Sequence, residues 1–405
     1  MKKSILLRSA ITLAFVSPCL AAPPLTWTTR QLTSEFQAEG AAAGDFNKDG
    51  VRDVVYGPWW FEGPGFTEKH TIYPDTPLDP RNYSKNFFAY TPDLNADGWQ
   101  DVLVLGFPGE ESYWFENPHG AAGDWKRHDV LKVTDAESPV WTDLTGDGKP
   151  EIVCAQDGYF GYASPGTDPT QEWPFTRISA EKASSGRFTH GLGVGDVNGD
   201  GRLDLLEKNG WWEHPADPAA QPVWAFHPFP FSEAGGAQMF AYDFDGDGDN
   251  DIFTSLAAHA YGLAWYEQVK DELDSISFIK HELMPTDPKA PSQVPLFSAI
   301  HAVDLADING DGVKDIVTGQ RYWAHAPRAD GTGGDDGVHN PPVLYWFEVK
   351  RGGKSGAAEF IPHLISNQSG VGTQVMVVDL DGKAPPEIVV GNKKGAFVSS
   401  ATAAP

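Results

Sequence analysis

The chain has 405 residues, with 56 acidic and 30 basic side chains and a formal net charge of −26 at pH 7. A chain this acidic, in which no basic cluster occurs, is not expected to bind the phosphate backbone of nucleic acids. Its length permits two domains, but the internal repeat described below favours a single one.

The N-terminus predicts a secretory signal peptide. Two lysines precede an apolar run that ends at Val16, and small residues up to Ala21 follow. The run is too short for a permanent membrane anchor, and no later stretch has the length and apolarity of a membrane helix. We therefore expect cleavage after Ala21, a secreted or periplasmic protein, and one mature domain over residues 22–405. Cys154 is then the one remaining cysteine, so no internal disulfide is expected and the thiol is predicted to be buried and structural.

A nine-residue loop pattern recurs along the mature chain. In residues 196–204, oxygen-bearing side chains occupy positions 1, 3, 5 and 9, and Gly201 occupies position 6. In an EF-hand-type loop such side chains, with the carbonyl of position 7, surround a calcium ion, and the glycine permits the sharp turn. Turns that bind no metal also use Asp, Asn and Gly, but they do not require this spacing. The six expected calcium sites are Asp45, Asn47, Asp49 and Asp53; Asp93, Asn95, Asp97 and Asp101; Asp143, Thr145, Asp147 and Glu151; Asp196, Asn198, Asp200 and Asp204; Asp243, Asp245, Asp247 and Asp251; and Asp307, Asn309, Asp311 and Asp315.

A seventh copy of the loop, which begins at Asp379, is altered. Lys383 occupies position 5, and Ala384 stands where the glycine is expected. We expect this copy to bind no metal and the ammonium group of Lys383 to take the place of the cation. The seven copies begin 47 to 72 residues apart, a period that is typical of repeat folds.

Short apolar and aromatic segments around each loop predict β-strands. One apolar strand precedes the loop, and three strands follow it, for example residues 53–55, 59–62 and 69–72. Four strands per unit, seven units and no helical periodicity predict an all-β, seven-bladed β-propeller. Two strands remain after the seventh loop, so residues 27–32 are expected to complete the last blade and to close the ring.

The loops resemble the FG-GAP and VCBS repeats of integrin-type propellers, which implies a calcium-binding propeller over nearly the whole mature chain. A closer resemblance is carried by residues 189–196 (THGLGVGD) and 210–215 (GWWEHP). These segments are similar to the propeller part of aldos-2-ulose dehydratase-like proteins, which dehydrate keto-sugars such as anhydrofructose. That family adds a cupin domain that is not found in this sequence, so the resemblance implies no isomerase chemistry.

Histidines that recur at the same position in most repeats are expected to be structural. Five of them lie in the outer-strand segment. They are His70, His128, His227, His281 and His363.

Two further histidines share a position that most repeats fill with other residues. His190 lies six residues before Asp196, and His301 lies six residues before Asp307. This position begins the innermost strand, about 20 Å from the loop at a rise of ~3.3 Å per residue. The ring of such positions is expected to line the mouth of the central channel, and its glutamates are additional acid–base candidates. In the other repeats the position holds Glu39, Phe87, Glu137, Ala237 and Thr373.

The loops between the second and third strands are expected to open on the same face as this ring. The insertion of residues 326–342 lies there, and its Gly-rich run suggests a mobile lid. A polar mouth is therefore predicted to contain His190, His259, His301, Tyr261, Lys208 and Arg321.

Such a mouth suits two kinds of chemistry. The neutral imidazoles of His190, His259 and His301 suit a divalent transition metal with an open coordination position. Alternatively, a histidine or Tyr261 removes a proton next to a carbonyl group while Arg321 neutralises the enolate that forms. Both fit an elimination on a sugar.

The sequence therefore predicts a secreted, calcium-stabilised propeller that acts as a carbohydrate lyase or dehydratase. The reaction would be a β-elimination on a keto-sugar or on a glycan that contains uronic acids. Two alternatives remain open, a non-catalytic propeller that binds glycan or protein and a structural member of an extracellular complex.

Overall fold

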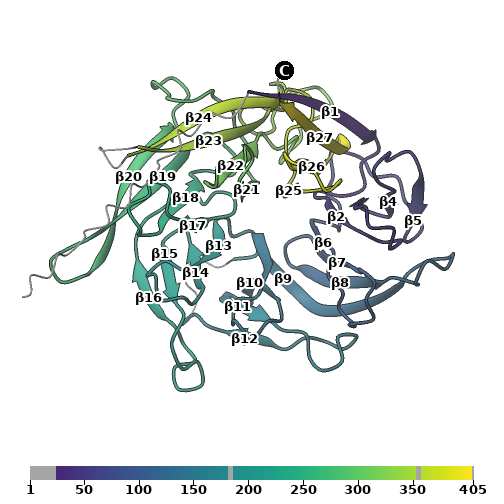
Figure 1. The fold of residues 1–405 in the computed structure, drawn as a ribbon, viewed down its shortest axis with the longest axis horizontal. Coiled ribbons are helices and arrows are strands. Elements are labelled where there is room, and N and C mark those ends of the chain that lie inside the picture. Colours follow the sequence, from purple (N-terminus) through teal and green to yellow (C-terminus); the bar gives the residue numbers. More distant parts are fainter. Residues whose placement is uncertain (1–23, 181–185, 353–356, 404–405) are drawn as a thin grey trace, which may run out of the picture.

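The computed structural model describes residues 24–180, 186–352 and 357–403. All regular secondary structure in these ranges is β-strand, with strands numbered up to β27, which confirms the predicted all-β class. Figure 1 shows the strands as small sheets arranged around a ring, each with one strand near the centre. This propeller-like arrangement places the start of every innermost strand close to the axis of the ring.

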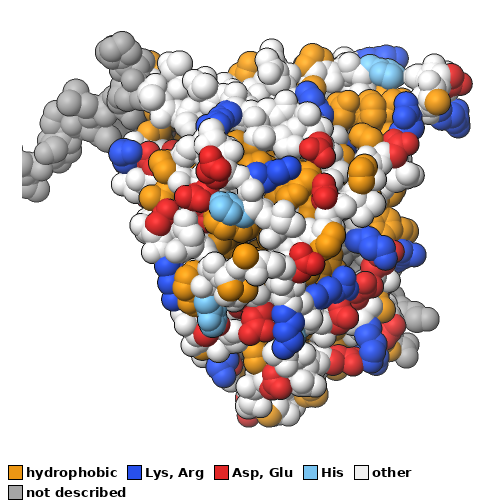
Figure 2. Space-filling model, turned by 90° about the vertical axis from the view of Figure 1, so that its right-hand side faces the viewer, with side chains coloured by type: hydrophobic (Ala, Val, Ile, Leu, Met, Phe, Trp, Pro, Cys, Tyr) orange, Lys and Arg blue, Asp and Glu red, His pale blue; other side chains and the backbone are white. Residues whose placement is uncertain are grey.

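The outer surface carries charged side chains of both signs. On the side of the ring shown in Figure 2, acidic and basic side chains intermingle, and no extended basic patch is visible there. Among the described residues, no helix has the length and apolarity needed to cross a bilayer. The predicted signal peptide lies outside the described residues.

Four sheets contain four antiparallel strands each, in chain order from the centre of the ring to its edge. They are β2 (Ala42–Gly44), β3 (Asp53–Tyr56), β4 (Trp59–Phe61) and β5 (Lys69–Thr71); β13 (Leu192–Gly195), β14 (Asp204–Glu207), β15 (Gly210–Glu213) and β16 (Ala225–Pro228); β17 (Phe240–Tyr242), β18 (Asp251–Ser255), β19 (Leu263–Lys270) and β20 (Ile276–Met284); and β21 (Val303–Ala306), β22 (Asp315–Gly319), β23 (Leu344–Gly352) and β24 (Ala357–Ser366).

A further four-stranded sheet joins the two ends of the chain. Its order is β1–β27–β26–β25, and β1 runs antiparallel to β27 with Trp27 opposite Ala401. The N-terminal strand thus lies at the outer edge of the last sheet, which is where the sequence analysis places it. The strands are β1 (Leu25–Thr33), β25 (Val375–Val378), β26 (Glu387–Asn392) and β27 (Gly395–Ala403).

The remaining sheet has seven strands because one long strand belongs to two units. β9 (Lys126–Thr142) pairs with β8 through residues 126–134 and with β10 through Asp135 and residues 140–142. It is the outer strand of one four-stranded unit and the innermost strand of the next. The order is β12–β11–β10–β9–β8–β7–β6, and the other strands are β6 (Phe88–Tyr90), β7 (Val102–Leu105), β8 (Glu110–Glu116), β10 (Glu151–Gln156), β11 (Tyr159–Ala163) and β12 (Phe175–Arg177).

The hydrophobic core lies between neighbouring sheets. Val54 of β3 packs in one buried cluster with Val389 of β26, and similar clusters fill the other junctions. Burying one such side chain contributes about 1.5–3 kcal/mol. Near the axis the sheets approach so closely that a Cβ on Gly193 would lie 2.0 Å from the carbonyl oxygen of Met239. This position of β13 therefore requires glycine.

The carboxylate at position 9 of the repeated loop ties the loop to its sheet. Asp204 accepts hydrogen bonds from the backbone N–H of Val197 and of His214, both at 2.8 Å. Burial, reinforced by the neighbouring loop carboxylates, raises the pKa of this residue to about 7. The same pair of bonds is made by Asp53, Asp101, Asp251 and Asp315.

A Trp–His–Glu unit recurs five times around the ring. In β19 and β20, the ring of His281 stacks on Trp265 with 4.4 Å between centroids, and its Nε2 lies 2.7 Å from a carboxylate oxygen of Glu267. These contacts join the third strand to the outer strand of each unit, in agreement with the structural role expected for the histidines. The other four units are Trp60, His70 and Glu62; Trp114, His128 and Glu116; Trp211, His227 and Glu213; and Trp346, His363 and Glu348.

Replacing one of these histidines should destabilise the fold. We expect His281→Ala to lower the free energy of unfolding by about 1–2 kcal/mol, because the substitution removes an aromatic contact and a hydrogen bond to a carboxylate. Chemical denaturation measures this change. His339→Ala, in an exposed loop, is the control and should change the free energy by less than ~0.5 kcal/mol; equal effects of the two substitutions would contradict the assignment.

Candidate functional site

Side chains at the start of four innermost strands come together on one face of the ring. Glu137 lies at their centre, with its Oε2 3.4 Å from His190 Nε2 and 3.9 Å from His301 Nε2. Arg321 links it to Glu39, because the guanidinium lies 3.6 Å from the same oxygen of Glu137 and 3.0 Å from Glu39 Oε2. Burial would raise the pKa of Glu137, but His190 and Arg321 outweigh it and hold the pKa below its usual range. The position six residues before the loop therefore selects side chains that are neighbours in space.

Three histidines from consecutive sheets form a cluster at this place. His190 precedes β13, His259 follows β18, and His301 precedes β21. Their ring centroids are 4.6 to 5.6 Å apart, and one nitrogen from each ring lies within 4.8 Å of the others. The ligand atoms of tetrahedral zinc are about 3.4 Å apart, given a Zn–N distance of ~2.1 Å. A shift of about an ångström would bring the rings to that spacing, which side-chain rotation can supply.

Nitrogen atoms of this cluster are buried without hydrogen-bond partners. This holds for His190 Nε2, His259 Nδ1 and His301 Nε2. The Nδ1 of His301 contacts the carbonyl oxygen of Ala299 at 3.2 Å, which favours the tautomer whose Nε2 carries a free lone pair. Burial, reinforced by the charge of Arg321, lowers the pKa of His301 well below its usual value. The neutral imidazole that results is the form that binds metal ions.

Arg321, which follows β22, is buried with donor groups to spare. Its side chain is 0% exposed, and Nη2 donates to Glu39, but Nε and Nη1 have no hydrogen-bond partner. Burial would lower the pKa of Arg321, but the carboxylates of Glu39 and Glu137 raise it, so the guanidinium stays charged. Lys393, also 0% exposed, lies 3.7 Å from Glu39 Oε1, and burial lowers its pKa to about 8. Unused donors of a buried cation favour an incoming acceptor.

The segment between β22 and β23 adds a histidine and an aspartate. His325 Nδ1 lies 2.7 Å from Asp335 Oδ1, and His259 Nδ1 lies 3.4 Å from the same oxygen. The rings of His259 and His325 stack at 4.4 Å. The hydrogen bond that His325 donates to Asp335 is the main cause of the raised pKa of His325. Burial would raise the pKa of Asp335, but the two histidines hold it far below its usual value, so the carboxylate remains ionised between them.

Residues 326–342, expected to form a mobile lid, are held to the body of the ring by several hydrogen bonds. Gln320 Nε2 donates to the carbonyl oxygen of Gly337 at 2.9 Å, and Trp323 Nε1 donates to that of Val338 at 3.3 Å. The hydroxyl of Ser298 donates to the carbonyl of Asp336. These contacts hold the segment against the body of the ring, which is how Asp335 reaches the histidines.

A cavity of about 420 Å³ lies beside these groups. Its polar lining consists of Glu137, His190, His259, Arg321 and His325, and its apolar lining includes three aromatic rings. Phe107 lies 5.2 Å from Tyr83 and 5.7 Å from Phe188, measured between ring centroids. The sequence analysis missed the aromatic residues and Asp335, because they come from loops whose positions the repeat does not specify. Tyr83, Phe107 and Phe188 are aromatic residues that lie outside the expected strands. That departure from the repeat is the signal that could have identified the aromatic lining.

Two residues predicted for the mouth lie elsewhere. Tyr261 packs against the hydrophobic cluster between β17–β20 and β21–β24, and the ammonium group of Lys208 donates to the carbonyl oxygen of Glu233 at 3.3 Å. Neither lines the cavity. Both follow second strands, as His259 and Arg321 do, but turns of different shape direct their side chains away from the cluster.

Two of the six predicted calcium loops bring three carboxylates close together. The carboxylates of Asp243, Asp245 and Asp251 offer oxygen atoms within 4.8 Å of one another, as do those of the third loop. The altered seventh loop also brings three carboxylates together. There, however, Lys383 Nζ lies 2.7 Å from Asp381 Oδ2, so a cationic group already stands beside the carboxylates.

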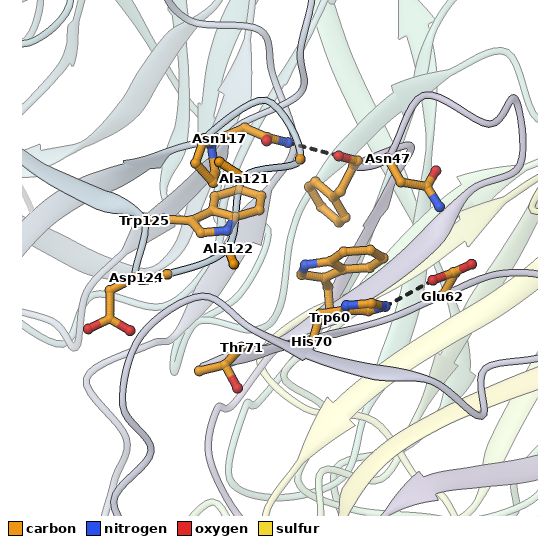
Figure 3. Close-up of a pocket in the computed structure, with 14 residues that line it drawn as sticks. Asn47, Trp60, Glu62, His70, Thr71, Asn117, Ala121, Ala122, Asp124 and Trp125 are labelled. Atoms are coloured by element: carbon orange, nitrogen blue, oxygen red, sulfur yellow. Dashed lines mark hydrogen bonds and ion pairs between the residues drawn. The ribbon is translucent and has the colours of Figure 1, made fainter.

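A larger cavity, of about 470 Å³, lies between the first two units near the edge of the ring. Figure 3 shows His70 between Trp60 and Glu62, with Trp125 across the cavity. His70 covers one face of the Trp60 indole at 3.9 Å. Because this lining is one copy of the recurring Trp–His–Glu unit, we assign the cavity to the architecture and not to function.

Comparisons with known proteins agree with the repeat pattern. A model of the FG-GAP-like repeat matches residues 93–154, which span the second and third predicted calcium loops. No curated protein matches the sequence.

Solved structures of similar arrangement include three carbohydrate-related proteins. A Pseudomonas aeruginosa periplasmic gluconolactonase shares 15% identity, with 89% of this chain and 91% of that chain covered and a TM-score of 0.49. An Agrocybe aegerita lectin that recognises non-reducing terminal N-acetylglucosamine shares 15% (95% and 86% covered, TM-score 0.47). The exotype rhamnogalacturonan lyase YesX shares 13% (94% and 74% covered, TM-score 0.46). At these values the functional argument depends on the site itself.

The buried charges make the site sensitive to loss of one partner. We expect Glu39→Gln to cost about 3–5 kcal/mol of unfolding free energy, because it leaves Arg321 and Lys393 buried without their shared carboxylate. Thermal or denaturant unfolding measures this cost. Glu35→Gln, a nearby exposed position, is the matched control and should be close to neutral; a Glu39 variant as stable as this control would disprove the network.

Proposed function

We propose that the mouth of this protein is a carbohydrate-active site that catalyses β-elimination. The observation that carries the proposal is the convergence of His190, His259 and His301 on Glu137 and Arg321, beside a cavity that all of these residues except the buried His301 line. These residues come from four different units of the ring, and the repeat requires none of them. Elimination next to a carbonyl group needs a proton acceptor and positive charge to stabilise an enolate, and this set offers both.

The three histidines are proposed ligands of a divalent transition metal such as zinc. Three neutral imidazoles with an open position are typical of catalytic zinc sites, and the unpaired Nε2 atoms of His190 and His301 fit that role. A bound cation would polarise a carbonyl or carboxylate oxygen of the substrate. Asp335 would orient His259 through its Nδ1, as carboxylates do behind metal-binding histidines.

His325 is the proposed proton acceptor. Its Nδ1 is held by Asp335 at 2.7 Å, so Nε2 carries the lone pair, and the side chain lines the cavity. His325 takes the proton from the carbon next to the carbonyl group, and the electron pair forms a carbon–carbon double bond. The carbon–oxygen bond at the next carbon breaks, and the leaving oxygen receives the proton from His325. Arg321 neutralises the enolate oxygen between these steps.

The aromatic lining supports an alternative, a non-catalytic propeller that binds glycans. Phe188 is 49% exposed and Tyr83 is 36% exposed, and both border the cavity. Exposed aromatic rings at a pocket mark a binding surface, and a sugar can lay its C–H groups against them. The alternative predicts sugar binding without turnover.

The scaffold is proposed to be a seven-bladed propeller with six calcium sites, exported from the cell. Division of β9 into two halves gives seven four-stranded units, and β1 completes the last of them. The crowded loop carboxylates support cation binding, because a divalent cation offsets their repulsion. The charged and apolar N-terminal residues support export.

Substitution of the cluster tests the enzymatic proposal. His190→Ala and His301→Ala should lower turnover by at least ~10³-fold while the melting temperature changes little. The assay incubates the protein with keto-sugars and with uronate oligomers and follows the ultraviolet absorbance of the enone or unsaturated uronate. His227→Ala, which changes a structural histidine of the outer strand, should retain turnover. Wild-type protein that binds these sugars without forming product would identify the binding module instead.

Removal of calcium tests the loops through the pH dependence of stability. The raised pKa of Asp204 and its equivalents means that the folded, metal-free state binds more protons than the unfolded state. Their contribution to stability is therefore present below about pH 4 and is lost as the pH rises through about 7. With EDTA, the melting temperature should be higher at pH 5 than at pH 8; with excess calcium, this order should reverse.

Two matched variants show which loops bind the cation. Asp200→Ala, in the fourth loop, should reduce the gain in melting temperature that calcium produces at pH 8. Asp381→Ala, in the seventh loop beside Lys383, should leave that gain unchanged. A protein whose stability does not respond to calcium would contradict the metal-binding role.

A further inference from the structure

We infer that the mouth takes a single terminal sugar unit that carries a carboxylate, a hexuronate, and that Arg321 binds this carboxylate. The inference rests on the proposed function and narrows its substrate class. It draws on three features of the site, the unused donors of Arg321, the balance of charges and the closure of the cavity on one side.

The first feature is the state of Arg321. Its guanidinium is fully buried. Nη2 donates a hydrogen bond to Glu39, whereas Nε and Nη1 have no hydrogen-bond partner. Buried donors that lack an acceptor are energetically unfavourable. Guanidinium groups and carboxylates match in shape and form paired hydrogen bonds. A carboxylate beside Arg321 accepts a charge-assisted hydrogen bond from one of these donors and adds the attraction of opposite charges, which a hydroxyl group of a neutral sugar cannot supply.

The second feature is the charge of the site once a divalent metal is bound. The carboxylate of Glu39 faces Lys393 at 3.7 Å, Asp335 faces His325 at 2.7 Å, and Glu137 faces Arg321 at 3.6 Å. With His325 in the neutral form that accepts a proton, the three carboxylates exceed the two cations Arg321 and Lys393 by one negative charge, so a divalent cation would leave the site with one net positive charge. Because charges interact more strongly where water is excluded, such a site favours an anionic ligand, and a bound ion is part of that balance.

The third feature is the rim of the cavity. The hydroxyl of Tyr83, which comes from the segment after β5, donates to the carbonyl oxygen of Ala324, which follows β22, at 2.8 Å. Lys393 lies over the Tyr83 ring, 4.1 Å from its centroid. This hydrogen bond joins two loops of the rim that are far apart in sequence, so a polymer cannot run straight through the mouth. One end of a chain can enter, with its ring against Phe107 and Phe188.

The experiment compares two oligosaccharides that differ in the carboxylate alone. Protein loaded with zinc in excess calcium is titrated in a calorimeter with trigalacturonate and with galactotriose of the same linkage. Zinc content is measured by mass spectrometry on the same samples. We expect trigalacturonate to bind at least tenfold more tightly, and digalacturonate and hexagalacturonate to bind within threefold of it, because one terminal unit occupies the cavity.

Variants assign the preference to Arg321. Arg321→Gln should weaken trigalacturonate binding by tenfold or more and leave galactotriose binding unchanged, whereas Arg321→Lys should keep part of the preference. Arg328→Gln, a position on the same face that does not line the cavity, is the matched control and should behave as wild type. The comparison of the two sugars on wild-type protein needs no variant, so it stands if an Arg321 variant fails to fold.

The outcomes separate this inference from the proposed function. If the protein contains zinc but binds the two trisaccharides with equal affinity, the inference is overturned and the metal site stands. The same holds if the affinity rises with each added galacturonate unit. An Arg321→Gln variant whose affinity falls equally for trigalacturonate and galactotriose would also overturn the inference, because Arg321 would then be structural. Protein that retains no zinc but still prefers trigalacturonate would support the role of Arg321 and contradict the metal part of the proposed function.

Discussion

The structure depends on the antiparallel pairing of β1 with β27. This pairing joins the first described strand to the last and so brings the first sheet beside the final one. Glu39, near the start of the first sheet, can then reach Arg321, which is 282 residues further along the chain, and its backbone accepts a hydrogen bond from Thr373. Without closure of the ring these groups would not meet. The charges at the mouth are therefore a product of the topology as much as of the residues.

Repetition separates architecture from function in this chain. The position-9 carboxylates and the Trp–His–Glu units occur in most of the units and make the same contacts in each, so their roles follow from the fold. The mouth is built from residues that break the repeat. His190 and His301 stand where other units have Phe87, Ala237 or Thr373, and the Nε2 atom of each has no hydrogen-bond partner. A repeat fold tolerates such unpaired groups near the axis because many identical sheet-to-sheet contacts stabilise it elsewhere.

The sequence was informative wherever a period constrained the position of a residue. Four hydrophobic segments per loop predicted the β-strands and their order, and counting six residues back from each loop identified Glu39, Glu137, His190 and His301 as neighbours. The loops between second and third strands follow no such rule. His259 and Arg321 were placed correctly, whereas Tyr261 turned into the core and Lys208 turned to Glu233. Asp335 could not be foreseen because a Gly-rich segment gives no periodic signal, and its contact with His259 depends on the hydrogen bonds that fix that segment.

The long strand β9 has a consequence for how this site can diversify. Because β9 passes from the second unit to the third without an intervening loop, Glu137 lies within the strand itself, in an irregular stretch between the pairs Asp135–Ala155 and Val140–Val153. An insertion at that corner would break the pairing of both units. The connection from β22 to β23, in contrast, already holds a long insert that carries Asp335. Homologous chains are therefore expected to vary in length and ligand choice between β22 and β23, and to keep the corner within β9 invariant.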